Sequence, residues 1–242
     1  MVPDFQPIEH GRWRIRTIPS QAQASVWGDT GTDGPAAFLE RTGDGGVANW
    51  MSTTLMERES QEIGIHGATG TTLMLGLGLG WAALNTMMNP SVTRLIVVER
   101  DAEVIALSAR SGVFAGLSPD QTARLEIVAG DAFTFVPDGP IDTLLADIWP
   151  SWLDTVVVEE MRAVQKRINA ARVHFWGQEA AIWRAAATRF GPLAPFDWEA
   201  IRTVVADDIA LPLILPDWDD YPQKIVDCLR RYGTPEIQSA LS

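Results

Sequence analysis

The chain has 242 residues, 46% of them hydrophobic, and a formal net charge of −12. This length accommodates one large core, or one core with a small appendage. The excess of 31 acidic over 19 basic residues, without a basic cluster, argues against nucleic acid as a partner and favours a neutral or cationic small molecule. The single cysteine, Cys228, excludes an intrachain disulfide and a cysteine zinc cluster. The sequence shows neither a secretion signal nor an apolar run near the roughly 18 residues that span a bilayer, so we expect a cytoplasmic protein.

Residues 1–52 predict a small antiparallel β appendage. Short apolar segments, separated by Gly, Asp, Thr and Pro, cover residues 13–18, 24–27, 36–40 and 47–50. The glycine-rich stretch 41–46 predicts a hairpin loop, because glycine supplies the positive φ that tight turns need. From residue 54 the pattern becomes helical, and Thr54 with Glu57 fits a capping box that starts a helix.

Residues 53–242 predict an α/β domain with a Rossmann-like, doubly wound, mostly parallel sheet. Short apolar strands alternate with helices, an order that builds a parallel sheet covered on both faces. The expected strands are 72–75, 95–98, 125–128, 143–146 and 173–176. The expected helices are 54–63, 81–88, 101–114, 155–169, 179–190 and 221–232. Prolines interrupt the pattern after residue 191.

The segment LMLGLGLGW at 73–81 places Gly76, Gly78 and Gly80 directly after the first of these strands. Ligands of doubly wound sheets bind beyond the carboxyl ends of the strands. Glycines without a Cβ let the chain turn sharply and let a ligand approach the backbone, while the following helix presents free N–H groups. A tight turn without a ligand is the alternative interpretation of this glycine loop (residues 76–80).

Glu99 ends the second strand, 23 residues after Gly76, where a carboxylate can accept both hydroxyl hydrogens of a ribose. Nicotinamide and adenosyl cofactors share that geometry. The dinucleotide fingerprint G-x-G-x-x-G would need glycine at position 81, where this chain has Trp81. Crowding at Trp81 and uncharged leucines between the glycines favour a nucleoside without phosphates.

Asp131 follows the third strand, where its carboxylate can accept from the exocyclic amine of adenine. Ala132 or Phe133 would then pack near the ring, and Arg100 lies beside Glu99 as a further candidate contact. An Asp that caps the next helix is the alternative. Each of these signals can occur by chance. The glycine loop, Glu99 and Asp131 in this order are much harder to explain as a chance arrangement.

These motifs resemble those of class I S-adenosylmethionine-dependent methyltransferases. TLMLGLGLGWAA, VVERD, AGDAF and LLADIWP match the family's successive motifs over about residues 70–190. The resemblance implies that Gly76, Gly78 and Gly80 border the methionine part of the cofactor, that Glu99 holds the ribose and that Asp131 holds the adenine. Leu75 replaces the acidic residue that many members carry before the first glycine.

A narrower resemblance reaches the N-terminus. PAAFLERTGDGGVANWMSTTLMERES is similar to the hairpin and helix that precede the core in spermidine synthases and their non-polyamine relatives. Aminopropyltransferases carry an Asp where this chain has Leu79, and their tyrosine-histidine-glutamate segment is missing around residues 55–57. We therefore expect the scaffold without the polyamine-specific contacts.

Asp147, at the end of the fourth strand, is the candidate for a base or for a residue that orients an amine. The resemblance also implies a catalytic or substrate-orienting acid there, whereas a capping role is the alternative. Trp50, Trp149, Trp152 and Trp176 fall at predicted strand ends, where aromatic faces favour a cation. Core packing is the alternative for each of them.

His10, His66 and His174 have no metal-ligand spacing and are expected to be structural, so no metal is predicted. Glu57, Glu59 and Glu62 are interpreted as a solvated helix face, and contact between one of them and the substrate is the alternative. We expect a methyltransferase that uses S-adenosylmethionine on a small molecule, with an amine as candidate acceptor, and a homodimer paired through the N-terminal sheet. The alternatives are an aminopropyltransferase-like enzyme, a nucleoside-binding protein without turnover and, disfavoured by Trp81, a nicotinamide oxidoreductase.

Overall fold

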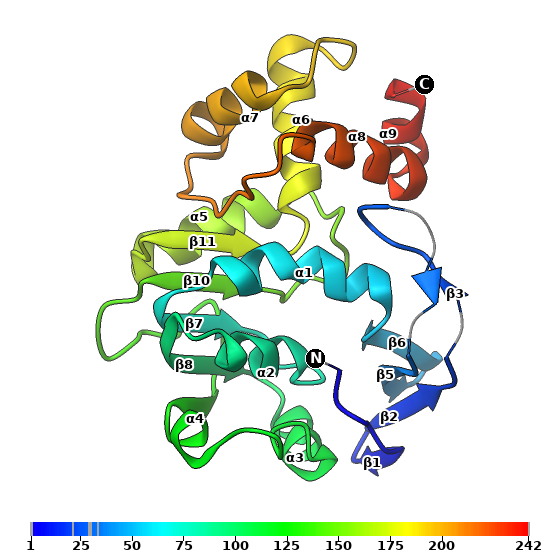
Figure 1. Ribbon diagram of the computed structural model, residues 1–242, viewed down its shortest axis with the longest axis vertical. Coiled ribbons are helices and arrows are strands. Elements are labelled where there is room, and N and C mark those ends of the chain that lie inside the picture. The colour runs from blue at the N-terminus through cyan, green and yellow to red at the C-terminus, as the bar shows by residue number, and fades with distance from the viewer. Residues whose placement is uncertain (1, 21, 29–30, 33, 242) are drawn as a thin grey trace.

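The computed structural model describes residues 2–20, 22–28, 31–32 and 34–241. A five-stranded parallel sheet lies at its centre, and a four-stranded antiparallel sheet lies beside it (Figure 1). The parallel sheet has the order β11-β10-β7-β8-β9. Its strands are β7 (Gly70–Leu75), β8 (Val92–Glu99), β9 (Leu125–Ala129), β10 (Thr143–Ala146) and β11 (Arg172–Phe175). The chain reverses its direction of winding between β7 and β10, so the Rossmann-like, doubly wound expectation is confirmed.

Helices cover both faces of the parallel sheet, which explains why its central strands are apolar along their length. All four residues of β10 are buried, as are the last four of β7. In Figure 1, α1 and α2 lie in front of the sheet and α5 lies behind it. The helices between and after the strands are α1 (Leu55–Gly67), α2 (Trp81–Met88), α3 (Ala102–Ser111), α4 (Pro119–Ala123), α5 (Val157–Ile168) and α6 (Gln178–Phe190). In the part of the chain that the structure describes, no helix is long and apolar enough to cross a membrane.

The antiparallel sheet confirms the predicted N-terminal appendage. It has the order β1-β2-β5-β6, and its strands are β1 (Ile8–His10), β2 (Trp13–Ile18), β5 (Ala36–Gly43) and β6 (Gly46–Ser52). The strand expected at 24–27 does not form. The chain instead makes a separate two-stranded ribbon from β3 (Ala22–Gln23) and β4 (Gly31–Thr32).

Two hydrophobic clusters hold these parts together. The larger fills the parallel sheet and its helices. The smaller joins the antiparallel sheet to α2 and α3 through Trp13, Leu39, Leu79, Leu84 and Leu107. The antiparallel sheet is therefore fixed over the helices that follow β7 and β8, at the edge where the glycine loop lies.

The predicted capping box at the start of α1 is wrong. Thr54 is the N-cap residue but makes no side-chain cap hydrogen bond. The carboxylate of Glu57 instead accepts from the backbone N–H and the hydroxyl of Ser52, at 2.7 and 2.6 Å. Glu57 therefore reaches back past the N-cap residue and binds the end of β6.

A C-terminal group of helices packs beside β11. It contains α7 (Trp198–Val204), a π-helical turn η1 (Val205–Ile209), α8 (Tyr221–Tyr232) and α9 (Pro235–Ala240). Only α8 was predicted, because prolines obscure the period of the others. The segment before α8 covers the edge of β11: Val173 donates its N–H to Pro212 and accepts from Ile214.

A buried carboxyl group ties this helical group to α6. Glu179, in the first turn of α6, is buried and accepts from the hydroxyl of the fully buried Tyr221 at 3.0 Å. Burial raises the pKa of Glu179 to about 7. Around Tyr221 pack the rings of Trp27, Trp198 and Trp218, with centroids 5.6–6.2 Å away.

Replacing Glu179 should change how stability depends on pH. The folded pKa of about 7 exceeds the ordinary 4.5, so the folded state holds the proton more tightly and loses stability as pH rises from about 4.5 through 7. Glu179→Gln keeps the acceptor for Tyr221 and removes this titration. Relative to wild type, the variant should gain about 3 kcal/mol of unfolding free energy between about pH 5 and pH 8, measured by urea unfolding. A difference that is constant across this range would contradict the assignment.

Candidate functional site

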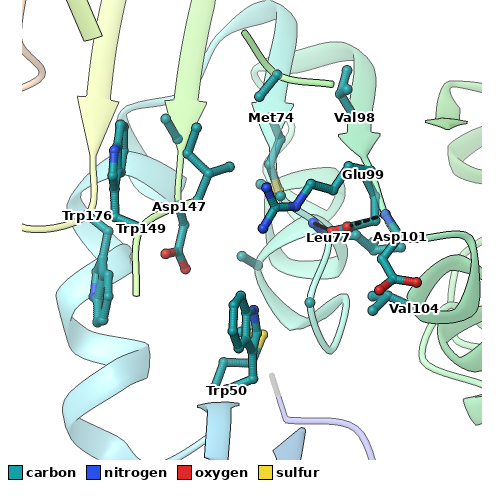
Figure 2. A pocket seen from close by; sticks show the side chains of 18 of the residues that line it. Trp50, Met74, Leu77, Val98, Glu99, Asp101, Val104, Asp147, Trp149 and Trp176 are labelled. Atoms are coloured by element: carbon teal, nitrogen blue, oxygen red, sulfur yellow. Dashed lines mark hydrogen bonds between the residues drawn. The ribbon is translucent and has the colours of Figure 1, made fainter. Parts of the chain in front are cut away.

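A cavity of about 560 Å³ opens at the carboxyl ends of the parallel strands, under α1 and the antiparallel sheet. Figure 2 shows Asp147, Trp149 and Trp176 on one side of it, Glu99 and Asp101 on the other, and Trp50 between the two sides. The cavity brings together nearly all of the site residues predicted from the sequence. Those that line it are Trp50, Gly76, Gly78, Glu99, Arg100, Asp131, Ala132, Asp147 and Trp149.

All three glycines of the loop have positive φ, as the sequence predicted for a sharp turn. The values are +97° at Gly76, +51° at Gly78 and +78° at Gly80. A Cβ on Gly76 would lie 2.3 Å from the backbone oxygen of Asp147, and one on Gly78 would lie 1.9 Å from the sulfur of Met51. The close approach that these glycines permit is thus made by neighbouring segments of the chain itself.

The leucines of the glycine loop have a packing role. Leu77 is buried in the main core, and Leu79 is buried in the cluster that joins the antiparallel sheet. Alternation of glycine and leucine therefore lets the loop turn while two side chains anchor it in two cores. For Leu79, which does not line the cavity, this packing role replaces the sequence-based reason, compatibility with an uncharged ligand. Leu77 also lines the cavity, so for it that reason stays a prediction.

Glu99 is held at the loop by backbone hydrogen bonds. One carboxylate oxygen accepts from the N–H of Leu77 at 3.0 Å, and the other accepts from the N–H of Asp101 at 2.8 Å. Each oxygen retains a second lone pair for a ligand. The carboxylate is thereby fixed between β8 and the loop, facing the cavity.

Asp131 both stabilises a turn and lines the cavity. Its carboxylate accepts from the N–H of Phe133 at 2.7 Å. Asp131 thus caps a turn, where the alternative interpretation expected it to cap a helix. Ala132 and Phe133 lie beside it in the cavity wall. A ligand can therefore contact this carboxylate only at its remaining acceptor positions.

Arginines border this side of the cavity, a feature the sequence analysis did not foresee beyond Arg100. Arg12 pairs with Asp101 at 3.0 Å. The guanidinium of Arg41 lies 5.6 Å from the ring of Trp13 and 5.9 Å from that of Trp50. The side of the cavity around Glu99 therefore carries both positive and negative side chains.

On the opposite side, around Asp147, the acids form no ion pair with any residue that the structure describes. Asp147 accepts from the amide of Gln61 at 2.5 Å, and burial raises its pKa to about 6. Glu57 also lines the cavity; burial and then the charge of Asp147 raise its pKa to about 8, although the bonds from Ser52 oppose the shift. The interpretation of Glu57 as part of a solvated face is corrected. Glu59 is likewise engaged, by the hydroxyl of Ser25 and the N–H of Val26.

His174 completes this side of the cavity. It is only 4% exposed, and burial lowers its pKa to about 4, so its ring is neutral. Its Nε2 has no hydrogen-bond partner among the described residues. Gly64 of α1 makes room for the ring, because a Cβ there would lie 2.6 Å from Nδ1. Sequence reasoning treated His174 as structural, and only its place on the last strand hinted at the cavity.

The tryptophans at the cavity differ in their exposure and in whether their indole N–H groups are engaged. Trp149 donates its indole N–H to Glu160, and Trp176 donates its own to Ser60, at 2.5 and 3.0 Å. Their polar atoms are thus satisfied, so they offer ring carbons to a ligand. Trp50 is 45% exposed and packs edge-on against Trp13.

Two predicted site residues lie outside the cavity lining. Gly80 caps the N-terminus of α2 and packs against Val113, Ser108 and Phe114 of the α3 region. Trp152 is partly buried, and its backbone oxygen approaches Gly177. Among the described residues, no group of three potential ligands is arranged to hold a metal ion. Cys228 is buried, and burial raises the pKa of its thiol to about 12.

Comparisons with known proteins give no family assignment. No family model matches the chain, and no curated protein does. Solved structures with partial similarity include a DhpI–SAM–HEP complex, with 20% identity over 44% of this chain and 42% of that chain and a TM-score of 0.31. The glycopeptide N-methyltransferase MtfA with sinefungin shows 19% identity over 46% and 42%, with a TM-score of 0.34. The methyltransferase domain of a bacterial CtHen1 shows 14% over 43% and 55%, with a TM-score of 0.35.

The present chain thus matches about half of the length of these structures. Similarity at this level does not extend to activity or substrate. Function has to be inferred from the cavity and its residues.

The geometry at Gly76 predicts a destabilising effect of a single methyl group. Gly76→Ala should cost the left-handed penalty of about 1–2 kcal/mol and a further 1–3 kcal/mol from the clash with the carbonyl of Asp147. Gly112→Ala is the control, because Gly112 is left-handed, with φ +74° and ψ 12°, and has nothing within 4 Å of the added Cβ. Urea unfolding of both variants measures the difference. Equal losses would show that the loop does not press against β10.

Proposed function

We propose that the protein is a methyltransferase that uses S-adenosylmethionine to methylate a small molecule. The observation that carries this proposal is the shared cavity, in which the glycine loop and Glu99 lie on one side and Asp147 on the other. Its volume of about 560 Å³ is within the ordinary range for small-molecule sites. The cofactor supplies a methyl group that a positive sulfur activates for transfer.

The residues of the cavity fit the cofactor by their chemistry. Glu99 would accept from the ribose hydroxyls, since its carboxylate is fixed by two backbone N–H groups and retains acceptor capacity. Asp131 would accept from the adenine amine, with Ala132 against the ring. Gly76 and Gly78 would border the methionine part. Arg100 is proposed as an outer contact, because its side chain is exposed at the rim.

A dinucleotide fits this cavity less well. The pyrophosphate of such a ligand binds the N–H groups at the start of the helix after the loop. Here Gly80 and Trp81, the first residues of that terminus, are buried and do not line the cavity. This burial favours a nucleoside without phosphates over a nicotinamide cofactor.

The first rival is aminopropyl transfer, as in the spermidine synthases that the N-terminal segment resembles. Leu79 is 1% exposed and packs in a hydrophobic cluster, so no carboxylate takes the place of the missing Asp. We expect calorimetry to show tighter binding of S-adenosylmethionine than of its decarboxylated form. The reverse order would favour the rival. Binding of both cofactors without turnover of any acceptor would favour a nucleoside-binding protein.

Replacing Glu99 tests the cofactor site directly. Glu99→Gln removes the charge and one acceptor oxygen, and should weaken binding of S-adenosylhomocysteine about 10- to 100-fold. Glu103→Gln is the control: its half-exposed carboxylate lies nearby on α3 and does not line the cavity. Isothermal titration calorimetry measures both. Equal affinities for the two variants and wild type would remove Glu99 from the site.

The homodimer, the cytoplasmic location and the division into residues 1–52 and 53–242 stay predictions. Strand β6 is an edge of the antiparallel sheet, and its residues 46–50 are exposed, which is the arrangement that pairing between copies would use.

A further inference from the structure

Helix α1 presents one face to the cavity, and the polar residues of that face are Glu57 and Gln61. Glu57, Gln61, Gly64 and Ile65 all line the cavity, and their spacing places them on one helical face. Gln61 donates to Asp147, which fixes the rotation of the helix relative to the end of β10. Glu57 lies one turn before Gln61 and therefore faces the same part of the cavity.

The two acids on this side lack a compensating cation. In the described part of the chain, neither Glu57 nor Asp147 forms an ion pair, and their hydrogen-bond donors are the neutral Ser52 and Gln61. The third titratable group here, His174, is neutral because it is buried. The arginines of the cavity belong to the opposite side, beside Glu99 and the antiparallel sheet.

This composition discriminates among acceptor molecules. A carboxylate or phosphate on the acceptor would be repelled by Asp147, and a neutral acceptor would leave a partly buried charge uncompensated. An ammonium group would supply the compensating positive charge, and it would donate hydrogen bonds to both acids. The faces of Trp149 and Trp176, whose N–H groups are engaged elsewhere, favour a cation that carries an apolar body.

We propose that the methyl acceptor is a primary or secondary amine, bound as its ammonium between Glu57 and Asp147, and that Glu57 determines this specificity. The proposal rests on the proposed methyltransferase function and extends it to a substrate class and to a residue of α1.

Asp147, the amine and S-adenosylmethionine together account for every atom and electron pair in the proposed transfer step. Asp147 accepts one N–H proton of the ammonium, which frees the lone pair of the nitrogen. The nitrogen then forms a bond to the methyl carbon while the carbon–sulfur bond breaks. The electron pair of the broken bond stays on sulfur, which becomes a neutral thioether. The raised pKa of Asp147, about 6, makes that carboxylate a better proton acceptor than an exposed aspartate. Glu57 accepts a hydrogen bond from a second N–H of the same nitrogen, which leaves the lone pair free to attack the methyl carbon.

Matched amines and alcohols test the proposal. Calorimetry would measure butylamine, phenethylamine and tryptamine against 1-butanol, 2-phenylethanol and tryptophol, each added to the protein saturated with S-adenosylhomocysteine. We expect at least one amine to bind at least tenfold more tightly than its alcohol. In Glu57→Gln this preference should fall at least tenfold, whereas Glu62→Gln, on α1 but outside the cavity lining, should keep it. Glu57→Gln should fold, because glutamine retains an acceptor for Ser52.

The outcomes separate this proposal from the function on which it rests. If S-adenosylhomocysteine binds and no amine is preferred over its alcohol, the amine proposal fails and the cofactor assignment stands. If the preference for an amine survives in Glu57→Gln, Glu57 does not determine the specificity for amines. If S-adenosylhomocysteine does not bind to wild type, the methyltransferase proposal itself fails.

Discussion

The alternation of glycine and leucine in the loop after β7 is the constraint on which the site depends. Left-handed backbone at Gly76, Gly78 and Gly80 turns the chain, while Leu77 and Leu79 enter two different hydrophobic clusters. The same turn directs the N–H of Leu77 at the carboxylate of Glu99. One short segment therefore joins the antiparallel sheet to the parallel sheet and sets the position of the acid proposed to bind ribose.

The fold was predictable because its signals are local. Short apolar strands ending in glycine or an acid, alternating with helices, fix the order of the elements, and the geometry of parallel sheets then brings their carboxyl ends to one edge. The position of Glu99, Asp131 and Asp147 at this edge, where they line the cavity, was predicted in this way without any knowledge of side-chain contacts. Of the helices after residue 191, only α8 was predicted, because its apolar face is regular. The others were missed because prolines hide their period.

The other half of the cavity was not predictable from local pattern. Whether Glu57 faces water or a cavity depends on the rotation of α1, which is set by Ser52, Gln61 and Asp147 from three separate segments. The fit of His174 against Gly64 likewise joins β11 to α1. Contacts of this kind arise only when the helix packs, so the sequence suggested a capping box and a solvated face instead.

The two sides of the cavity have different electrostatic characters. Mixed charges and backbone hydrogen bonds surround Glu99. Beside Asp147 lie Glu57 and aromatic faces, and neither acid forms an ion pair with a described residue. This division gives a physical reason for binding two molecules side by side: a nucleoside on one side and a cationic acceptor on the other. A crystal structure with S-adenosylhomocysteine is the most direct test of this account. It predicts both ribose hydroxyls within hydrogen-bond distance of Glu99 and the sulfur facing the space beside Asp147; a ribose remote from Glu99 would contradict it.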